Sequence, residues 1–280
     1  MLKKLFRLLK FVWFHSLNQN NRLAAVGRVM RFQIASRNIK APIILPFVND
    51  TQLITIHGMT RATGNWYCGL LEYEEMSFLL HALQSGDLFV DVIAFEPIPS
   101  TFSDLKKNIK LNLLDNKVIA KNIGLADQKS TLNFRKNLDT VNHVILNNEK
   151  NYPSTKVDVQ RLDDVLEKKC PTIIKIDVEG YEAQVLEGAK KLIDNPTLIA
   201  VMIELNRSGK RYGKDDNVIH QLLISKGFES FQYVSFKYKL KSLKDKFNKI
   251  TNTLYPRNLD KIQSRISKKN DFILATGQKI

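Results

Sequence analysis

The chain has 280 residues, of which 44% are hydrophobic and 25% charged, so it is globular and not collagen-like, low-complexity or disordered. Its net charge of +15 is concentrated in two places: residues 1–40 carry nine Lys/Arg and no Asp/Glu, and residues 237–270 carry eleven against two. Residues 41–236 hold 22 Lys/Arg and 25 Asp/Glu, which argues against a nucleic-acid-binding core. We therefore expect no nucleic-acid partner, and an anionic surface that meets the two basic regions.

Residues 2–14 are predicted to form a basic amphipathic helix within a basic N-terminal region over residues 1–40. One arc of the helix carries the basic residues Lys3, Lys4, Arg7 and Lys10, and the opposite arc carries Leu2, Leu5, Leu8, Leu9 and Val12. This pattern is typical of a helix that docks on an anionic membrane surface. It is also typical of a helix that packs on its own domain and leaves its basic face in water, so both interpretations stay open.

The sequence favours a cytoplasmic protein, and the docking interpretation would place it at the inner face of the membrane. Its two cysteines, Cys68 and Cys170, are too few for a disulfide framework or a cysteine-rich zinc site, and they fit a reducing compartment. No run of 18 or more apolar residues predicts a membrane-spanning helix. The basic start of the chain is not followed by the small-residue cleavage site of a signal peptide.

The following elements alternate along the chain. Turn-forming residues divide residues 41–70 into short extended segments. Helices are predicted over 71–84, 100–113, 181–193 and 216–226, and strands over 88–95, 118–123, 131–134, 156–160, 172–178, 198–205, 228–236 and 271–276. This alternation predicts an α/β fold with a Rossmann-like, doubly wound and mostly parallel sheet.

The basic region 237–270 is predicted to be a helical insert in this α/β domain, which we expect to span residues 41–280. Apolar residues recur at spacings of three and four on both sides of Pro256, which indicates two short amphipathic helices broken at the proline. These residues are Leu240, Leu243, Phe247, Ile250 and Leu254, and then Leu259, Ile262 and Ile266. The helices either pack on the domain or form a lid or docking surface over an acceptor site.

Carboxylates stand at the ends of several predicted strands: Asp91 or Glu96, Asp177 with Glu179, and Glu204. Ligands of parallel sheets bind outside the carboxyl ends of the strands. These acids are therefore expected to meet a polar ligand with hydroxyls or an amine, or a metal ion. Because no His/Cys cluster accompanies them, the carboxylates alone specify no metal site, and we expect none.

Two blocks of residues resemble the FkbM-type methyltransferase family. The first is Gly86-Asp-Leu-Phe-Val-Asp-Val92 followed by Ile93-Ala-Phe-Glu-Pro-Ile-Pro99, and the second is Lys175-Ile-Asp-Val-Glu-Gly-Tyr-Glu182. Leu186-Glu-Gly-Ala189 and Asn108–Asn112 extend a likeness that covers about residues 70–205. The resemblance implies a class I, S-adenosylmethionine-dependent methyltransferase fold. It also implies methyl transfer to an oxygen, often on a sugar, a glycan or a natural-product precursor.

The resemblance also implies how the cofactor would be held. Glu96 would accept hydrogen bonds from the ribose hydroxyls of S-adenosylmethionine, since an ionised carboxylate only accepts. Asp91 would lie near the amino-acid end of the cofactor. Gly124 and Asp127 would lie near its adenine.

For catalysis, the resemblance places Asp177 and Glu179 opposite the transferring methyl group and the acceptor. One of them, or His143, could act as the general base on an acceptor hydroxyl. Simpler interpretations stand beside these roles. His143 could be a surface or hydrogen-bonded histidine, Asp177 could cap the helix over 181–193, and Glu204 could cap a helix or form a salt bridge.

One segment departs from the family pattern. Family members place a glycine-rich turn and a helix between the Val-Asp-Val strand and the strand that enters Phe-Glu-Pro, whereas here Val92 is followed directly by Ile93. A parallel crossover needs about a dozen residues or more, so Leu88–Phe95 can form only one strand. An internal deletion, a loss of cofactor binding, or replacement of the turn by another segment would each explain the difference.

Two functions follow from these observations. The first is a methyltransferase that uses S-adenosylmethionine to methylate a sugar hydroxyl on a glycan or related precursor. The alternative is a catalytically inactive relative that binds a glycan, a membrane or a partner protein, which the missing turn favours. The expected partners are a small-molecule or glycan acceptor and an anionic membrane surface.

Overall fold

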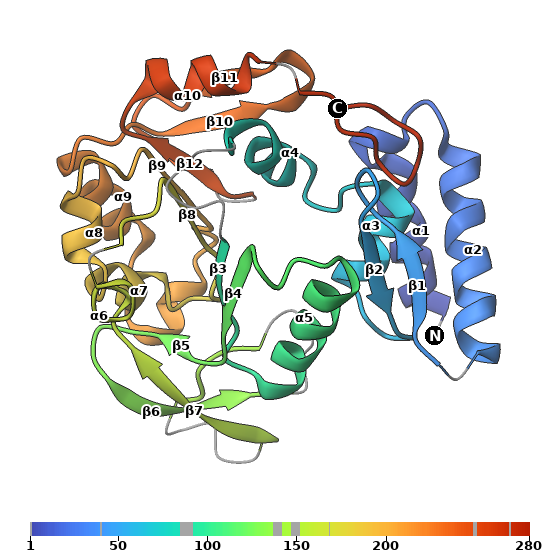
Figure 1. Cartoon of the computed structure of the whole chain (residues 1–280), viewed down its shortest axis with the longest axis horizontal. Helices are drawn as coiled ribbons and strands as arrows, with labels where there is room; N and C mark the ends of the chain where they lie inside the picture. Colours follow the sequence, from blue (N-terminus) through green and yellow to red (C-terminus); the bar gives the residue numbers. More distant parts are fainter. Residues whose placement is uncertain are drawn as a thin grey trace. The chain divides into compact units, whose positions relative to one another are not determined.

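The computed structural model describes residues 2–39, 41–84, 92–136, 142–146, 152–167, 169–248, 251–268 and 270–280. The chain forms two compact units (Figure 1). Unit 1 comprises Met1–Leu80, Lys107–Leu114 and Asn270–Ile280, and unit 2 comprises His81–Lys106 and Asp115–Lys269. The basic N-terminal region and the residues that follow it up to Leu80 therefore belong to the same unit.

Unit 1 is built from helices and a hairpin. Its elements are α1 (Leu2–Phe14), the 3-10 turn η1 (Ser16–Asn18), α2 (Arg22–Asn38), β1 (Ile43–Pro46), β2 (Gln52–Thr55), α3 (Arg61–Cys68) and most of α4 (Tyr73–Ala82). Helix α1 confirms the helix predicted over residues 2–14. Its apolar arc packs into a core with α2 and α3, formed by Leu5, Leu8, Leu9, Val12, Ala25, Val29, Phe32, Tyr67 and Cys68. The apolar arc is therefore covered by the protein itself.

Two parts of unit 1 differ from the sequence expectation. Residues 61–68 form the helix α3 where short extended segments were predicted, because Gly64 serves close packing and not a turn: a Cβ there would lie 2.6 Å from the side chain of Leu71. Residues 271–276 were predicted as a strand of the α/β domain. They instead belong to unit 1, where Leu274 forms an isolated bridge with Val48.

Unit 2 carries the alternating elements. They are β3 (Val92–Phe95), the start of α5 (Pro99–Leu111), β4 (Val118–Lys121), β5 (Gly124–Leu125), β6 (Ser130–Arg135), β7 (Ser154–Gln160), α6 (Leu162–Leu166), β8 (Ile173–Ile176), α7 (Glu182–Glu187), α8 (Lys190–Asp194), β9 (Ala200–Ile203), η3 (Ser208–Tyr212), α9 (Asp216–Ser225), β10 (Phe231–Val234), η4 (Ser235–Lys237), β11 (Lys239–Ser242), β12 (Thr253–Pro256) and α10 (Leu259–Ile266). Each strand and helix predicted between residues 100 and 236 has a counterpart, although the helix over 181–193 is divided. The division falls at Gly188, where a Cβ would collide with the carbonyl oxygen of Ala126.

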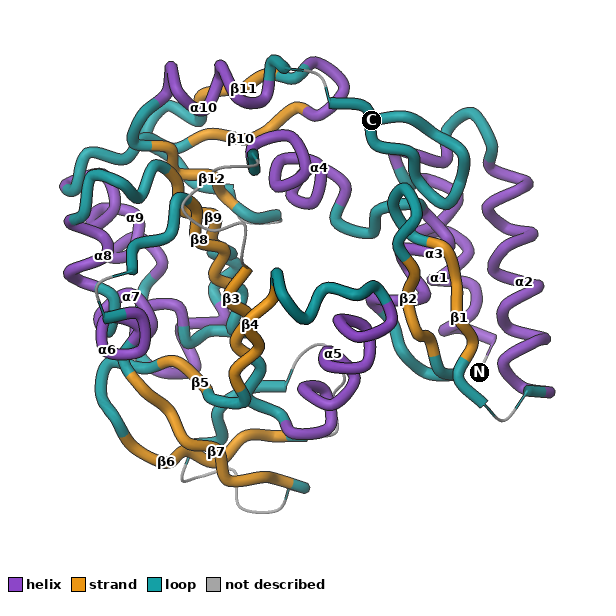
Figure 2. Tube along the Cα trace, in the orientation of Figure 1, coloured by secondary structure: helices purple, strands orange, loops and turns teal. Residues whose placement is uncertain are grey.

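The strands form several small sheets (Figure 2). A five-stranded sheet has the order β11-β10-β12-β9-β8, and β3-β4, β5-β7-β6 and β1-β2 form three smaller sheets. Five of the eight pairings between described strands are antiparallel; the parallel ones are β3–β4, β5–β7 and β8–β9. The α/β class is confirmed, but small mixed sheets take the place of one mostly parallel sheet. Residues 85–91, which include the first half of the strand predicted over 88–95 and with it Asp91, lie outside the described residues.

The basic region 237–270 is helical only in its second half. Helix α10 matches the predicted segment after Pro256, but the segment before it contains β11 and β12. The reason is the position of β12, which pairs with both β9 and β10 and has Leu254 and Tyr255 buried. The pairing of β12 with two neighbouring strands makes this segment a strand, although the three-and-four spacing of its apolar residues also fits a helix.

The main core of unit 2 joins the strands to the helices beside them. Helices α6 to α9 contribute Leu166, Leu186, Ile193 and Leu223, among others, to a buried cluster with the side chains of β8 and β9. Ile93 and Phe95 of β3 pack against the same cluster. Within the described residues, no helix has both the length and the apolar character needed to cross a bilayer.

Candidate functional site

The carboxyl ends of β8 and β9 bring two acidic residues to one edge of the sheet. The strands are parallel with Ile176 opposite Ile203, so the next residues, Asp177 and Glu204, leave the sheet side by side. The Glu204 amide donates a hydrogen bond to the Ile176 carbonyl at 3.3 Å, which extends the pairing into this edge. The prediction that carboxylates collect at the strand ends is therefore confirmed for this pair of strands.

A tight turn follows β8 and holds a third acidic residue. Glu179 has a left-handed backbone (φ 53°), and Gly180 has φ 105°. The carboxylate of Glu182, only 2% exposed, accepts hydrogen bonds from the backbone N–H of Gly180 at 3.0 Å and of Val178 at 3.4 Å. A buried acid at the start of α7 thus fixes the turn that presents Glu179.

Asp177, Glu179 and Glu204 form a carboxylate cluster. Each offers an oxygen, and these oxygens lie within 4.8 Å of one another. Lys175 Nζ is 2.7 Å from Asp177 Oδ2 and supplies one positive charge to the cluster. Oxygen ligands of this kind suit a hard cation, but the carboxylates by themselves do not define a metal site, so the expectation of no metal stays a prediction.

Crowding of negative charge changes the protonation of this edge. Burial raises the pKa of Glu204 to about 7, and the negative charges of Asp177, Glu179 and Glu182 add to the rise. Burial also raises the pKa of Glu182 to about 7, against the lowering effect of its backbone hydrogen bonds. Near neutral pH, Glu204 can therefore both accept and release a proton.

A basic loop packs against the acidic turn. The loop contains η3 and is anchored where Asp216 Oδ2 accepts the Arg207 N–H at 2.7 Å. Gly180 lies directly against it, since a Cβ at that position would be 2.7 Å from the Ser208 carbonyl oxygen. The rings of Tyr181 and Tyr212 meet edge to face at 5.1 Å. These contacts hold the turn against the loop.

His143 is 5% exposed and precedes Val144, which forms an isolated bridge with Phe134 of β6. Its carbonyl accepts a hydrogen bond from the Arg135 N–H, and the next residue, Val144, accepts one from the Tyr212 hydroxyl at 2.8 Å. This chain of contacts links the segment to the basic loop. The carboxylate cluster does not include His143, so its role as general base stays a prediction, while its burial favours the interpretation of a structural histidine.

Glu96 follows β3, as predicted, at the carboxyl end of the β3–β4 pair. Its Oε1 accepts the N–H of Ile98 at 2.8 Å, and its backbone carbonyl accepts a hydrogen bond from the Asn122 side chain at 2.8 Å. The carboxylate therefore also organises its own turn. Its predicted partner Asp91 lies outside the described residues.

Gly124 and Asp127 lie at and after β5. Gly124 is buried, and a Cβ there would lie 2.9 Å from the side chain of Val159 on β7, so close packing requires the glycine. Asp127 is exposed, and its charge contributes to the raised pKa of Tyr181. The structure thus places Asp127 near the start of α7; the predicted role of both residues at the adenine stays a prediction.

Sequence reasoning gave no role to two features of this site. Glu182 stood in the quoted block, and its position three residues after Glu179 at a helix start was the signal that it could bind backbone N–H groups. The loop around η3, residues 208–212, received no role either. Its packing against Gly180 depends on a contact 28 residues away in sequence, which no local pattern reveals.

The fold and this edge define an α/β protein with a cluster of carboxylates at the carboxyl ends of two parallel strands. Residues 70–230, more than half of the chain, match the family model described as the methyltransferase FkbM domain. The chain therefore belongs to the FkbM methyltransferase family, as its two sequence blocks indicated.

The chain is also similar to two known proteins. A protein named Methyltransferase 1 from Beauveria bassiana (strain ARSEF 2860) is 32% identical over 165 residues. The match covers 49% of this chain and 62% of that protein, so the chain spans less than two thirds of that relative. The crystal structure of methyltransferase FkbM from Methylobacillus flagellatus KT is 18% identical, with a TM-score of 0.38, covering 60% of this chain and 36% of that chain.

Proposed function

We propose that the protein is an S-adenosylmethionine-dependent methyltransferase that methylates a sugar hydroxyl on a glycan or a related precursor. Membership of the FkbM family supports the reaction class. One observation carries the proposal for this chain: three carboxylates, Asp177, Glu179 and Glu204, converge at the carboxyl ends of two parallel strands. This is where α/β sheets bind their ligands.

The proposal includes a class I-like arrangement of the strands. Strand β3 sends Ile93 and Phe95 into the core that lies under β8 and β9. The parallel pairs β3–β4 and β8–β9 would then be two parts of one Rossmann-like layer, with their carboxyl ends at a common edge. Glu96 and Asp177 end the strands of the two pairs and would bind the cofactor and the acceptor respectively.

The residues at the end of β3 suit the ribose of the cofactor. Glu96 is half-buried and presents a carboxylate, which only accepts hydrogen bonds and so matches a pair of hydroxyls. When bound, S-adenosylmethionine supplies an electrophilic methyl group. Asp127, exposed beyond β5, would take part in holding the adenine end.

The carboxylate cluster would prepare the acceptor. An acceptor hydroxyl would donate a hydrogen bond to the cluster, and its proton would pass to a carboxylate oxygen as the hydroxyl oxygen gains its methyl group. A pKa of about 7 makes Glu204 suited to hold that proton and release it afterwards. Lys175 would keep Asp177 ionised and oriented through their 2.7 Å ion pair.

Calorimetric titration with S-adenosylhomocysteine tests the cofactor part. We expect binding in the micromolar range, weakened about tenfold by Glu96→Gln because a charge-assisted hydrogen bond becomes neutral. Glu229→Gln is a matched control, since Glu229 is an exposed carboxylate of the same unit, and it should leave binding unchanged. No heat of binding up to millimolar ligand would contradict the proposal.

Methyl transfer from labelled S-adenosylmethionine to a panel of sugars and glycans tests the acceptor part. Glu204→Gln and Asp177→Asn should lower kcat by about a hundredfold or more, with little change in cofactor binding. Loss of cofactor binding in these variants would instead place the cluster at the cofactor.

A second candidate function is a non-catalytic binding protein. The observation that favours it is the direct succession of Val92 and Ile93, which leaves no room for a glycine-rich turn between them. Glycine-rich turns let the backbone approach a cofactor closely. Absence of cofactor binding, together with retained binding of a glycan from the panel, would support this candidate.

A further inference from the structure

Helix α1 has two faces, and the structure shows which one is free. Leu5, Leu8, Leu9 and Val12 face the core of unit 1, with Val12 fully buried. The opposite face carries exposed residues at positions 3, 4, 6, 7, 10, 11 and 14, which lie on one side of a helix. The face that could meet a partner is therefore not the apolar arc recognised in the sequence.

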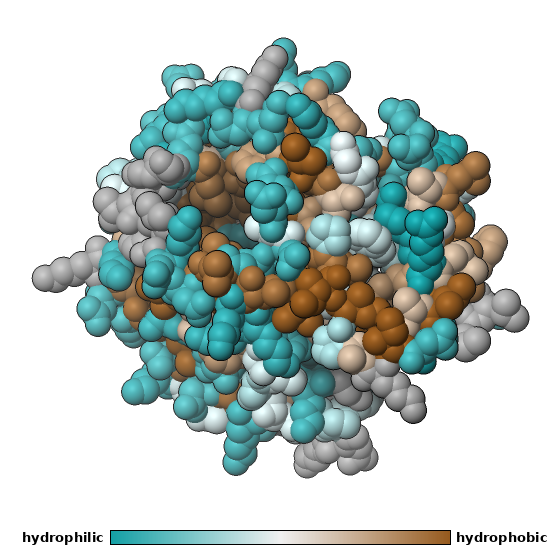
Figure 3. Space-filling view, turned by 45° about the vertical axis from the view of Figure 1, so that its right-hand side comes forward, coloured by the Kyte–Doolittle hydropathy of each residue, from teal (hydrophilic) through white to brown (hydrophobic). Residues whose placement is uncertain are grey.

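This outer face combines basic and aromatic side chains. Phe6 is 70% exposed, Phe14 is 64% exposed and Phe11 is 45% exposed. Among the described residues, only one other phenylalanine, Phe236, is comparably exposed. Large apolar side chains exposed together mark an interaction surface more often than a solvated one. Figure 3 shows apolar residues at the molecular surface beside polar ones on the face that it displays.

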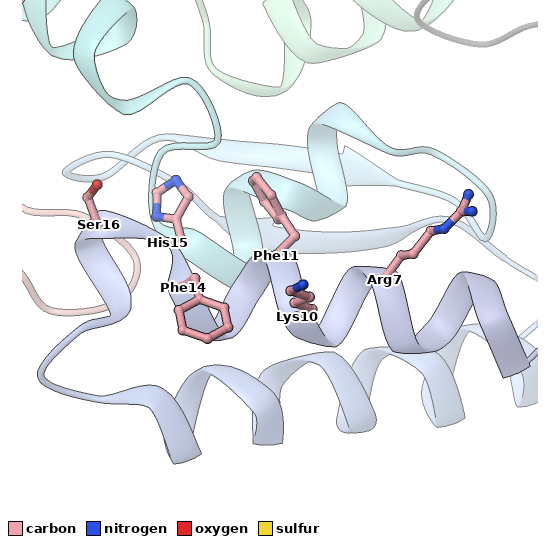
Figure 4. Close-up of a pocket in the computed structure, with 6 residues that line it drawn as sticks. All are labelled: Arg7, Lys10, Phe11, Phe14, His15 and Ser16. Atoms are coloured by element: carbon pink, nitrogen blue, oxygen red, sulfur yellow. The ribbon is translucent and has the colours of Figure 1, made fainter. Parts of the chain in front are cut away.

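Positive charge surrounds these rings. Lys3, Lys4, Arg7 and Lys10 lie on the same exposed face, and residues 1–40 contain no acidic residue. Arg7 and Lys10 line a cavity of about 450 Å³ together with Phe11, Phe14, His15 and Ser16 (Figure 4). Phe11 is held there by an edge-to-face contact with His15 at 5.5 Å. The cavity therefore has cations on one part of its wall and aromatic rings on another.

We propose that this outer face of α1 docks on an anionic membrane surface, with Phe6 and Phe14 inserted at the level of the headgroups and the cavity beside Arg7 and Lys10 holding a lipid phosphate. Charge complementarity selects this occupant: the face is basic without acidic neighbours in sequence, and a bilayer rich in anionic lipid is attracted by such a cluster. Helices that lie in a membrane interface carry Lys and Arg together with Trp, Phe or Leu.

Co-sedimentation of the full chain with vesicles tests the proposal. Vesicles of phosphatidylcholine with about one-third phosphatidylserine should bind it, and pure phosphatidylcholine should bind it at least tenfold less. Binding should fall as salt is added. Free inorganic phosphate at constant ionic strength should not displace the protein, because the rings as well as the phosphate are bound. Equal binding to neutral vesicles would overturn the proposal.

Variants on the exposed face of α1 distinguish binding through this face from binding through the basic region 237–270. The triple change Lys3→Glu, Arg7→Glu, Lys10→Glu should reduce binding to anionic vesicles at least tenfold. The pair Phe6→Ser, Phe14→Ser should reduce it by a similar factor. Because all five side chains are exposed, the melting temperature should not change.

Matched controls lie in unit 2. Phe236→Ser removes a ring that is 64% exposed, and Lys237→Glu, Lys239→Glu, Lys241→Glu reverses three exposed lysines. Both controls should bind as the unaltered chain does, and loss of binding in these controls but not in the α1 variants would overturn the proposal. So would a fall in oligomeric mass of the α1 variants without vesicles, because the face would then be covered by a second copy of the chain.

Discussion

The carboxyl ends of two pairs of parallel strands give the same signal in the sequence and become different in the structure. At the end of β3, Glu96 uses a carboxylate oxygen to accept the N–H of Ile98, two residues away. At the ends of β8 and β9, three carboxylates lie within 4.8 Å of one another, and burial, together with the negative charges around it, raises the pKa of Glu204 to about 7. An acid after an apolar strand therefore has a chemical meaning only once its neighbours are known. At the first edge, the carboxylate has a hydrogen-bond partner in its own turn. At the second edge, the clustered carboxylates repel one another.

The largest expected effect concerns the turn that makes the crowded edge. Gly180→Ala should destabilise unit 2 by about 3 kcal/mol or more, because the new Cβ meets the Ser208 carbonyl at 2.7 Å on a backbone of φ 105°. Thermal and denaturant unfolding measure the change. Gly213→Ala is the matched control: it also has positive φ but nothing within 4 Å, so only about 1–2 kcal/mol of backbone strain applies. Equal losses in both would contradict the close packing of turn and loop.

The next effect concerns the acid beneath the turn. Glu182→Ala should cost about 2–3 kcal/mol, because the N–H groups of Val178 and Gly180 lose their acceptor in a buried place. Glu182→Gln keeps an acceptor oxygen and should recover most of the loss. Denaturant unfolding compares the two variants. A Gln variant as unstable as the Ala variant would show that the charge, and not the hydrogen bond, holds the turn.

The third effect is a dependence of stability on pH. The usual pKa near 4.5 of Glu182 and Glu204 is raised to about 7 in the folded chain, so between these values the folded state binds more protons than the unfolded state. The contribution of both residues to the free energy of unfolding is therefore present at low pH and is lost as the pH rises towards about 7. The double variant Glu182→Gln, Glu204→Gln should reduce this fall when unfolding is followed across the window. An unchanged slope would exclude raised pKa values.

The smallest expected effect concerns Glu96 at the carboxyl end of β3. Glu96→Ala should cost about 0.5–1 kcal/mol, since the half-buried turn loses one acceptor and water can partly replace it. Chemical denaturation is precise enough to compare it with Glu182→Ala. A loss as large as that of Glu182→Ala would remove the contrast between the two edges.

Strong apolar runs allowed the α/β class and the order of most helices and strands of unit 2 to be predicted, but not the division into small mixed sheets. The run Ile173-Ile-Lys-Ile176 before Asp177 gave β8, and parallel pairing then brought Glu204 beside it. The region before Pro256 was misjudged because Leu254 satisfies a helical spacing as well as a central strand. The helix α3 was missed because Gly64 was taken for a turn residue although it packs against Leu71.

The candidate site was predictable in its position but not in its electrostatics. Asp177 and Glu179 belong to a recognisable block, whereas the raised pKa of Glu204 depends on burial and on three other carboxylates. The orientation of Glu182 back towards its own backbone also depends on the turn geometry. The pKa of Glu204 and the orientation of Glu182 depend on groups that are brought together by folding, and a local sequence pattern does not show which groups these are.

Glu179 occupies a backbone conformation that glycine would adopt more easily, with φ 53°. Laboratory evolution for heat resistance alone would therefore be expected to exchange it for glycine, with a gain of up to about 1 kcal/mol. The same exchange would delete one of the three clustered carboxylates. A screen that keeps the fold but ignores chemistry should thus accumulate Glu179→Gly, while a screen for the reaction should retain the strained acid.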